Sequence, residues 1–152
     1  MRIRLIWEGK TRDHHLAALQ AEYLSRIAHF AEIRVEELSA GRSASSRQKL
    51  SASERKMLEK AAGTVKVALD ERGKEWTSHE FAAWMSECAV RGTREIAFLA
   101  GGPEGFSAAF RDEADVQLAL SRMTLTHDWA RTLLLEQIYR SFTLQRGYPY
   151  PR

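Results

Sequence analysis

A glycine-rich turn is the feature of this sequence with the clearest chemical meaning. The run Gly-Gly-Pro-Glu-Gly at 101–105 directly follows the apolar segment 94–100. Ligands of α/β proteins bind beyond the carboxyl ends of such strands, and glycine lets a ligand approach the main chain closely. The run does not match a phosphate loop or a dinucleotide loop, and Pro103 has no amide N–H to donate. We therefore expect main-chain hydrogen bonds to an adenine edge or a ribose. A plain strand-to-helix turn, with Glu104 near a helix N-terminus, is the alternative.

Side chains suited to metal or nucleophilic chemistry are sparse. His14 and His15 are adjacent and point to different sides of a helix, so they cannot chelate together. The single cysteine, Cys88, falls on the apolar stripe of its helix and is expected in the core. His127 follows the last predicted strand and its loop, where a site role and a capping or packing role are both open. We expect no metal site.

Alternating strands and helices must position the glycine turn. Periodicity predicts strands at 2–7, 33–38, 64–70, 94–100 and 116–120, and helices at 13–30, 51–62, 78–91, 107–114 and 126–143. Residues 39–47 are expected to form a mobile loop, and 71–74 a turn. This order predicts an α/β fold whose mostly parallel sheet carries helices on both faces.

The length of 152 residues predicts one domain spanning 1–152. Apolar residues make up 44% of the chain, and no apolar run approaches the roughly 18 to 20 residues that cross a bilayer. We expect a cytoplasmic protein with no membrane partner. One cysteine cannot form an internal disulfide, so burial of apolar surface must stabilise the fold.

Positive charge is concentrated in two segments of the chain. Residues 40–60 carry six basic and two acidic side chains, residues 122–152 carry five and two, and the intervening 61–121 carry six and ten. If the fold brings the two segments together, their surface would attract a polyanion through counterion release. The alternative is that 40–60 is an ordinary solvated loop and helix face.

Three segments dominate the last third of the chain: FLAGGPEGFS at 98–107, LALSRMTLTHDWARTLLLEQIYRSF at 118–142 and RGYPYPR at 146–152. Together they resemble the ribosomal RNA large subunit methyltransferase H family, a minimal group within the SPOUT superfamily. The opening strand, YLSR at 23–26, the AGR of the basic loop and LDERGKEWTS at 69–78 extend the resemblance to nearly the full length. The resemblance implies a SPOUT-type α/β knot, with a trefoil knot at the C-terminal end.

The resemblance also implies an activity. Members of this family transfer a methyl group from S-adenosyl-L-methionine to N3 of a pseudouridine in 23S ribosomal RNA of the assembled 70S ribosome, as homodimers. Carried over by position, the cofactor-binding residues would be Leu69, Gly101, Gly102, Leu120, Ser121, Arg122, Met123, Thr124 and Leu125, with Glu104 at the border. We expect Trp129, Leu133 and Ile138, on the last helix, to pack against a second copy.

The catalytic expectations rest on three further residues. Arg140 is expected to stabilise the anion that forms as N3 loses its proton, with an ion pair to Glu136 as the alternative. Tyr150 could stack on a base, and Arg152 could hold a phosphate. Relatives usually end close to His-Pro-Tyr-His-Arg, whereas this chain has Tyr148 and Pro151 at the histidine positions. A non-catalytic ribosome-binding or RNA-binding protein that retains the SPOUT fold is therefore the alternative function.

Overall fold

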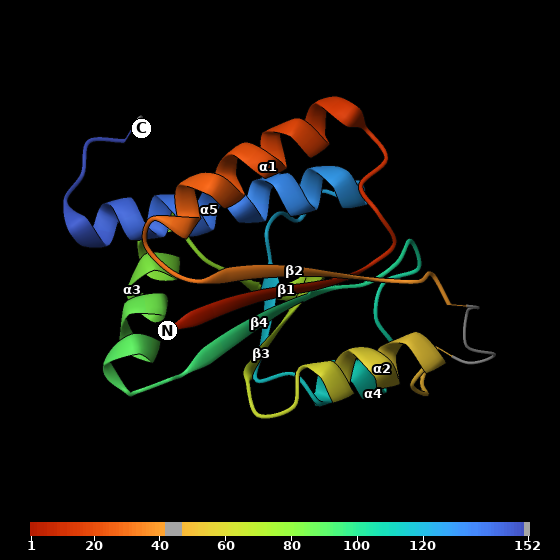
Figure 1. Cartoon of the computed structure of the whole chain (residues 1–152). Coiled ribbons are helices and arrows are strands. Elements are labelled where there is room, and N and C mark those ends of the chain that lie inside the picture. Colours follow the sequence, from red (N-terminus) through yellow and green to blue (C-terminus); the bar gives the residue numbers. More distant parts are fainter. Residues whose placement is uncertain (42–46, 151–152) are drawn as a thin grey trace.

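A five-stranded parallel sheet forms the centre of the molecule. The computed structural model describes residues 1–41 and 47–150, and the strands lie in the order β2-β1-β4-β3-β5 (Figure 1). The strands are β1 (Arg2–Glu8), β2 (Ile33–Leu38), β3 (Val65–Glu75), β4 (Glu95–Ala100) and β5 (Val116–Ala119). The helices are α1 (His14–Ala28), α2 (Ala52–Lys60), α3 (Ser78–Val90), α4 (Ala108–Asp112) and α5 (His127–Arg146). The predicted α/β class with a parallel sheet is confirmed.

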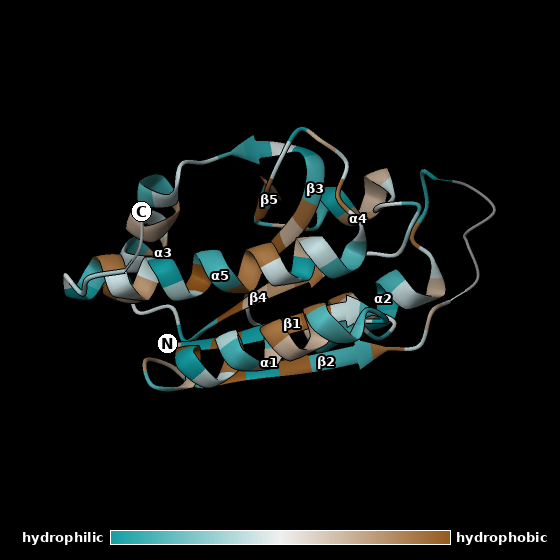
Figure 2. Cartoon of the chain, turned by 90° about the horizontal axis from the view of Figure 1, so that it is seen from above, coloured by the Kyte–Doolittle hydropathy of each residue, from teal (hydrophilic) through white to brown (hydrophobic). Residues whose placement is uncertain are grey.

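Two apolar layers cover the two faces of the sheet. Because side chains alternate along a strand, Ile3, Leu5 and Trp7 of β1 face one layer while Ile6 faces the other. The first layer also takes residues from α1, α3 and α5, and the second takes residues from α2 and α4. In Figure 1, α1 and α5 lie on one side of the sheet and α2 and α4 on the other. All six residues of β4 are buried, as expected of a central parallel strand. In Figure 2, brown apolar segments lie along the strands and on stripes of the helices.

The third strand is longer than predicted. The sequence indicated a strand at 64–70 and a turn at 71–74, but β3 continues to Glu75 and pairs with β5 on both sides of a register shift between Leu69 and Lys74. At Gly73 an added Cβ would lie 2.6 Å from the carbonyl oxygen of Gln117, so the two backbones approach as closely as only glycine allows. The bulge replaces the predicted turn because pairing with β5 gives this polar segment backbone partners.

The helices that carry much of the two positive segments, α2 and α5, lie on opposite faces of the sheet (Figure 1). The described part of residues 40–60 includes α2, which lies across the sheet from α5 (Figure 1). In addition, Arg131 is buried and adds nothing to the surface. The basic side chains of α2 and α5 therefore do not form one polyanion-binding face in the isolated chain, although Arg47 lines a cavity together with the start of α5. Residues 42–46, which include Arg42 of the basic loop, lie outside the described residues.

Candidate cofactor site

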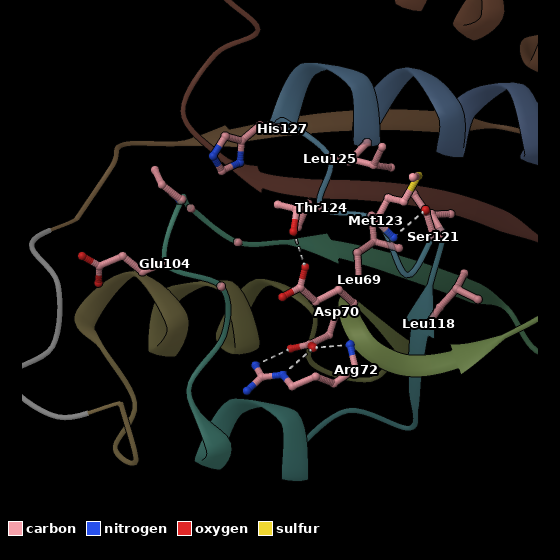
Figure 3. Close-up of a pocket in the computed structure, with 18 of the residues that line it drawn as sticks. Leu69, Asp70, Arg72, Glu104, Leu118, Ser121, Met123, Thr124, Leu125 and His127 are labelled. Carbon is pink, nitrogen blue, oxygen red and sulfur yellow. Dashed lines mark hydrogen bonds and ion pairs between the residues drawn. The ribbon is translucent and has the colours of Figure 1, made fainter.

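The loops after three neighbouring strands line one cavity. Strands β4, β3 and β5 are adjacent and parallel, so their carboxyl ends meet at one edge of the sheet. The cavity there measures about 340 Å³ (Figure 3). It is lined by residues that follow β4 and β5 and by residues at the bulge of β3, with the beginning of α5 above them.

Most of the predicted cofactor residues lie together in this cavity. Its lining includes Leu69, Gly101, Gly102, Glu104, Leu120, Ser121, Met123, Thr124 and Leu125. Arg122 is the exception, because its side chain is 86% exposed and lies 3.1 Å from the carboxylate of Glu75. The structure thus brings together every cofactor residue carried over by resemblance except Arg122.

Hydrogen bonds fix the shape of the loop at residues 120–126. The amide of Met123 donates to the hydroxyl of Ser121 at 2.9 Å, which closes a tight turn. The hydroxyl of Thr124 donates to the carboxylate of Glu71 at 3.1 Å, so the loop is tied to the bulge of β3 (Figure 3). The loop at 120–126 and the bulge of β3, which both line the cavity, are therefore held in one arrangement.

The glycine loop lies close to neighbouring side chains at two positions, so that a side chain added at either would displace its neighbour. A Cβ at Gly101 would lie 3.0 Å from the ring of Phe106, and one at Gly102 would lie 2.7 Å from the carboxylate of Glu8. Gly105 adopts φ of 71°, the left-handed region that favours glycine. The loop thus presents main-chain atoms to the cavity. A second cavity, of about 350 Å³, lies on the opposite side of the same loop and is bordered by Glu8 and Glu54.

Asp70 and Arg72 are lining residues that the sequence reasoning missed. The Asp70 carboxylate accepts from the amide, Nε and Nη2 of Arg72 at 2.9, 2.9 and 3.0 Å. Burial acts to raise the pKa of Asp70, but the hydrogen bonds from Arg72 outweigh it and hold that pKa below its ordinary value. The available signal was an acid placed directly after a buried strand, with an arginine two residues later.

The beginning of α5 completes the wall of the cavity. His127 and Ala130 both line it, and Figure 3 shows the imidazole of His127 above the glycine loop. The site role considered for His127 is therefore compatible with its position. Thr126 is the N-cap residue of the helix, and Asp128 lies in its first turn, where the helix dipole favours an acidic side chain.

Arg140 and Tyr150 form a separate cluster near the other end of α5. The guanidinium of Arg140 donates from Nε to the carboxylate of Glu136 at 3.0 Å, and it lies 4.6 Å from the ring centre of Tyr150. The Tyr150 hydroxyl lies 3.0 Å from that of Tyr23 and donates to Glu136 at 3.2 Å. The hydrogen bond to Glu136 raises the pKa of Arg140, and burial raises that of Tyr150. The predicted alternative ion pair with Glu136 is present. Arg152 lies outside the described residues.

Comparison with known proteins identifies the family of this chain. A family described as "Predicted SPOUT methyltransferase" matches residues 1–151. The chain belongs to the SPOUT methyltransferase family. The "Ribosomal RNA large subunit methyltransferase H" of Geobacter sp. (strain M21) is 40% identical to this SPOUT chain over 153 residues, which cover 99% of the chain and 98% of the relative. The protein of the same name from Porphyromonas gingivalis (strain ATCC 33277) is 36% identical over 154 residues, covering 99% and 98%. The resemblance seen in the sequence is confirmed.

Solved structures share the SPOUT fold at low sequence identity. A putative methylase family protein from Neisseria gonorrhoeae aligns with a TM-score of 0.58 and 11% identity, over 99% of this chain and 85% of that one. A probable methyltransferase from Bordetella pertussis Tohama I aligns with a TM-score of 0.57 and 10% identity, over 92% and 95%. These likenesses support the α/β architecture. The trefoil knot implied by the resemblance stays a prediction.

The apolar stripe of α5 in this SPOUT chain divides into core and surface. Ile138 is fully buried within the chain, so its predicted packing against a second copy is wrong. Trp129, by contrast, is 56% exposed, and Leu133 lines a shallow apolar cavity with Trp76 and Phe81. Only the surface part of the stripe is available for another molecule.

Within residues 1–41 and 47–150, no three His, Cys, Asp or Glu side chains gather where they could hold a metal ion. Over the same residues, none of the helices combines the length and the apolar character needed to cross a membrane.

Proposed function

We propose that this protein transfers a methyl group from S-adenosyl-L-methionine to N3 of a pseudouridine in 23S ribosomal RNA of the assembled 70S ribosome. The observation that carries the proposal is the cavity at the ends of β3, β4 and β5, which gathers the carried-over cofactor residues in a SPOUT chain. Support for the substrate comes from the 40% identity to a relative named for methylation of large-subunit ribosomal RNA. Such a substrate places the protein in the cytoplasm.

The residues of the cavity fit this methyl donor. Close packing at Gly101 and Gly102 leaves main-chain groups to contact an adenine or a ribose, and Leu69, Leu118 and Leu120 offer apolar walls. The donor carries no phosphate, which agrees with a loop that lacks phosphate-binding features. When bound, S-adenosyl-L-methionine supplies a methyl group on a positively charged sulfur, which is already activated for displacement. The chain must then provide position rather than a strong nucleophile.

Arg140 would act on the acceptor, and geometry assigns that role to a second copy. Ala130 lines the cavity, and Arg140 follows it by ten residues on the same helix, which is about 15 Å along the axis. An arginine that far from the cavity of its own chain meets a donor only across an interface. We therefore propose a homodimer in which Arg140, Tyr150 and Arg152 of one copy face the cavity of the other. There, Arg140 would stabilise negative charge on the base as N3 loses its proton.

Dimerisation would also enlarge the surface that meets RNA. Exposed Trp129 supplies an apolar contact beside the cavity. In a dimer, the basic α2 segment of one copy and the basic α5 segment of the other would add to one positive surface for RNA. Tyr150 and Arg152 would then contact a base and a phosphate, respectively.

A binding experiment and a transfer experiment test the proposal together. We expect isothermal titration to give saturable binding of S-adenosyl-L-methionine, and radiolabelled methyl to appear in the 23S RNA of intact 70S particles but not of free RNA. The missing tail histidines favour one alternative, a non-catalytic ribosome-binding protein. Particle binding without donor binding or methyl transfer would establish that alternative and reject the enzyme.

A further inference from the structure

Arg131 is a buried cation that the proposed chemistry does not use. The residue is 1% exposed, and burial lowers the pKa of its guanidinium below the ordinary value. Within residues 1–41 and 47–150 it forms no ion pair with a carboxylate, and its Nε has no hydrogen-bond partner. Removing an arginine from water in this way costs free energy, and an apolar side chain of similar size would not incur that cost. Stability alone therefore does not explain why an arginine occupies this buried position.

The contacts of Arg131 are directed at the end of β1. Its Nη2 donates to the main-chain carbonyl of Glu8 at 2.6 Å, and its Nη1 donates to the hydroxyl of Thr11 at 3.3 Å. The guanidinium carbon lies 4.8 Å from the ring centre of Trp7. The planar group thus stacks on one residue of the strand while it bonds to the next. These contacts fix where α5 begins relative to β1.

Arg131 and Glu8, the two residues of this contact, each lie next to a loop that lines the cavity. Arg131 stands four residues after His127 on the same face of α5, one residue after Ala130, and just beyond the loop at 120–126. Glu8 lies against the glycine loop. Its carboxylate oxygen would be 2.7 Å from a Cβ added at Gly102. The Glu8 carboxylate is held in turn by the amide of Gly41 and the hydroxyl of Ser53, at 2.8 and 3.1 Å.

We propose that Arg131 is a positioning residue that sets the spacing between the loop at 120–126 and the glycine loop at 101–105 by joining α5 to the end of β1. This inference rests on the proposed function, because it assigns the two loops to the methyl donor. It differs from a purely structural role in one respect. Loss of the guanidinium changes the affinity for the donor more than it changes the stability of the fold.

The test compares Arg131→Met and Arg131→Lys with the wild type. S-adenosyl-L-homocysteine is the probe, so that binding is measured without turnover. For Arg131→Met we expect an unfolding midpoint within about 4 °C of the wild type and a dissociation constant about tenfold higher. Arg131→Lys keeps a donor for the Glu8 carbonyl but not the stacked plane, and we expect an intermediate constant. Arg91→Met, at an exposed arginine paired with Glu87, is the matched control and should bind like the wild type.

Hydrogen exchange separates this inference from the proposed function. We expect amides at 120–126 to exchange faster in ligand-free Arg131→Met, while those of β4 remain unchanged. A folded Arg131→Met protein with wild-type affinity and wild-type exchange would overturn the inference. If Arg131→Met does not fold, wild-type affinity in Arg131→Lys overturns it instead. If the wild type itself does not bind the probe, the proposed function fails, and unchanged exchange at 120–126 then also overturns the role of Arg131.

Discussion

At the scale of single residues, the catalytic role proposed for Arg140 has to coexist with an ion pair. Its charge is paired with Glu136, and both groups surround the hydroxyl and the ring of Tyr150. A partly buried pair of this kind orients the guanidinium without removing its charge. The ion pair and the proposed action on the acceptor are therefore compatible, because Glu136 can hold the arginine in the orientation that the acceptor requires.

Substitution of Arg140 is predicted to reduce turnover without removing the donor site. We expect Arg140→Ala to lower kcat by about 10² to 10³ because a preorganised positive charge is lost, while the affinity for S-adenosyl-L-homocysteine stays the same. Methyl transfer to 70S particles and calorimetry measure the two effects. Arg34→Ala removes an exposed arginine that pairs with Glu32 and is the matched control. Wild-type turnover in Arg140→Ala would end the assignment.

Asp70 is predicted to make stability depend on acid pH. Its pKa is lower in the folded chain than the ordinary 3.8, so the unfolded chain binds the proton first as the pH falls. The stabilisation by Asp70 is therefore complete above the ordinary value and is lost as the pH falls through the folded value. We expect urea unfolding at a series of pH values to show a smaller acid-induced loss for Asp70→Asn than for the wild type. Parallel losses in the two proteins would contradict this.

At the scale of elements, the bulge of β3 holds two parts of the proposed donor site. Leu69, Asp70 and Glu71 reach the cavity because β3 shifts register after Leu69 and then resumes its pairing with β5. Glu71 bonds to Thr124 and Glu75 pairs with Arg122, so the same element holds the facing loop at two points. The bulge thus positions two parts of the cavity lining: its own residues and the loop at 120–126 to which it is bonded.

Gly73→Ala is predicted to disturb this element and the donor site together. The new Cβ would meet the backbone of Gln117, which cannot rotate away as a side chain can. We expect a loss of about 1 to 3 kcal/mol in the free energy of unfolding, and weaker binding of S-adenosyl-L-homocysteine. Gly63→Ala is the control, because nothing lies within 4 Å of its added Cβ and only its positive φ is strained. That variant should lose some stability but bind normally, and equal affinity in both variants would refute the prediction.

Sequence periodicity predicts the elements of this fold where burial alternates clearly. Strand β4 and the stripe of Leu134 and Ile138 follow directly from apolar spacing, and the glycine run lies at the edge of the sheet where the cavity is found. The bulge of β3 is not predictable in the same way. Residues 70–75 are mostly charged, and their strand conformation comes from backbone pairing with β5, which no local pattern encodes. The Asp70 contribution to the cavity was missed for that reason.

At the scale of the whole molecule, the proposed function depends on association of two copies, because Arg140 lies far from the cavity of its own chain. Periodicity alone could not divide the apolar stripe of α5 between core and interface, because both uses require the same spacing. The structure makes that division by burying Ile138 and leaving Trp129 exposed.

An acidic residue at the exposed part of the stripe is predicted to separate the copies. We expect light scattering to give a dimer mass for the wild type at micromolar concentration and a monomer mass for Trp129→Asp, because a charge would be buried at the contact. Methyl transfer should fall with dimerisation. Val90→Asp, which places the same charge on an 85% exposed valine at the end of α3, should remain dimeric. A monomeric wild type would contradict the proposed assembly.

The glycine loop, with a cavity on each side, also has a consequence for inhibitor design. Residues 101–105 line both cavities, and Gly101 and Gly102 contribute no side chains there. A compound bound in the second cavity, against Glu8 and Glu54, would contact the glycine loop from that side and would not need to imitate a nucleoside. Its selectivity would come from Glu8 and Glu54, which do not line the first cavity.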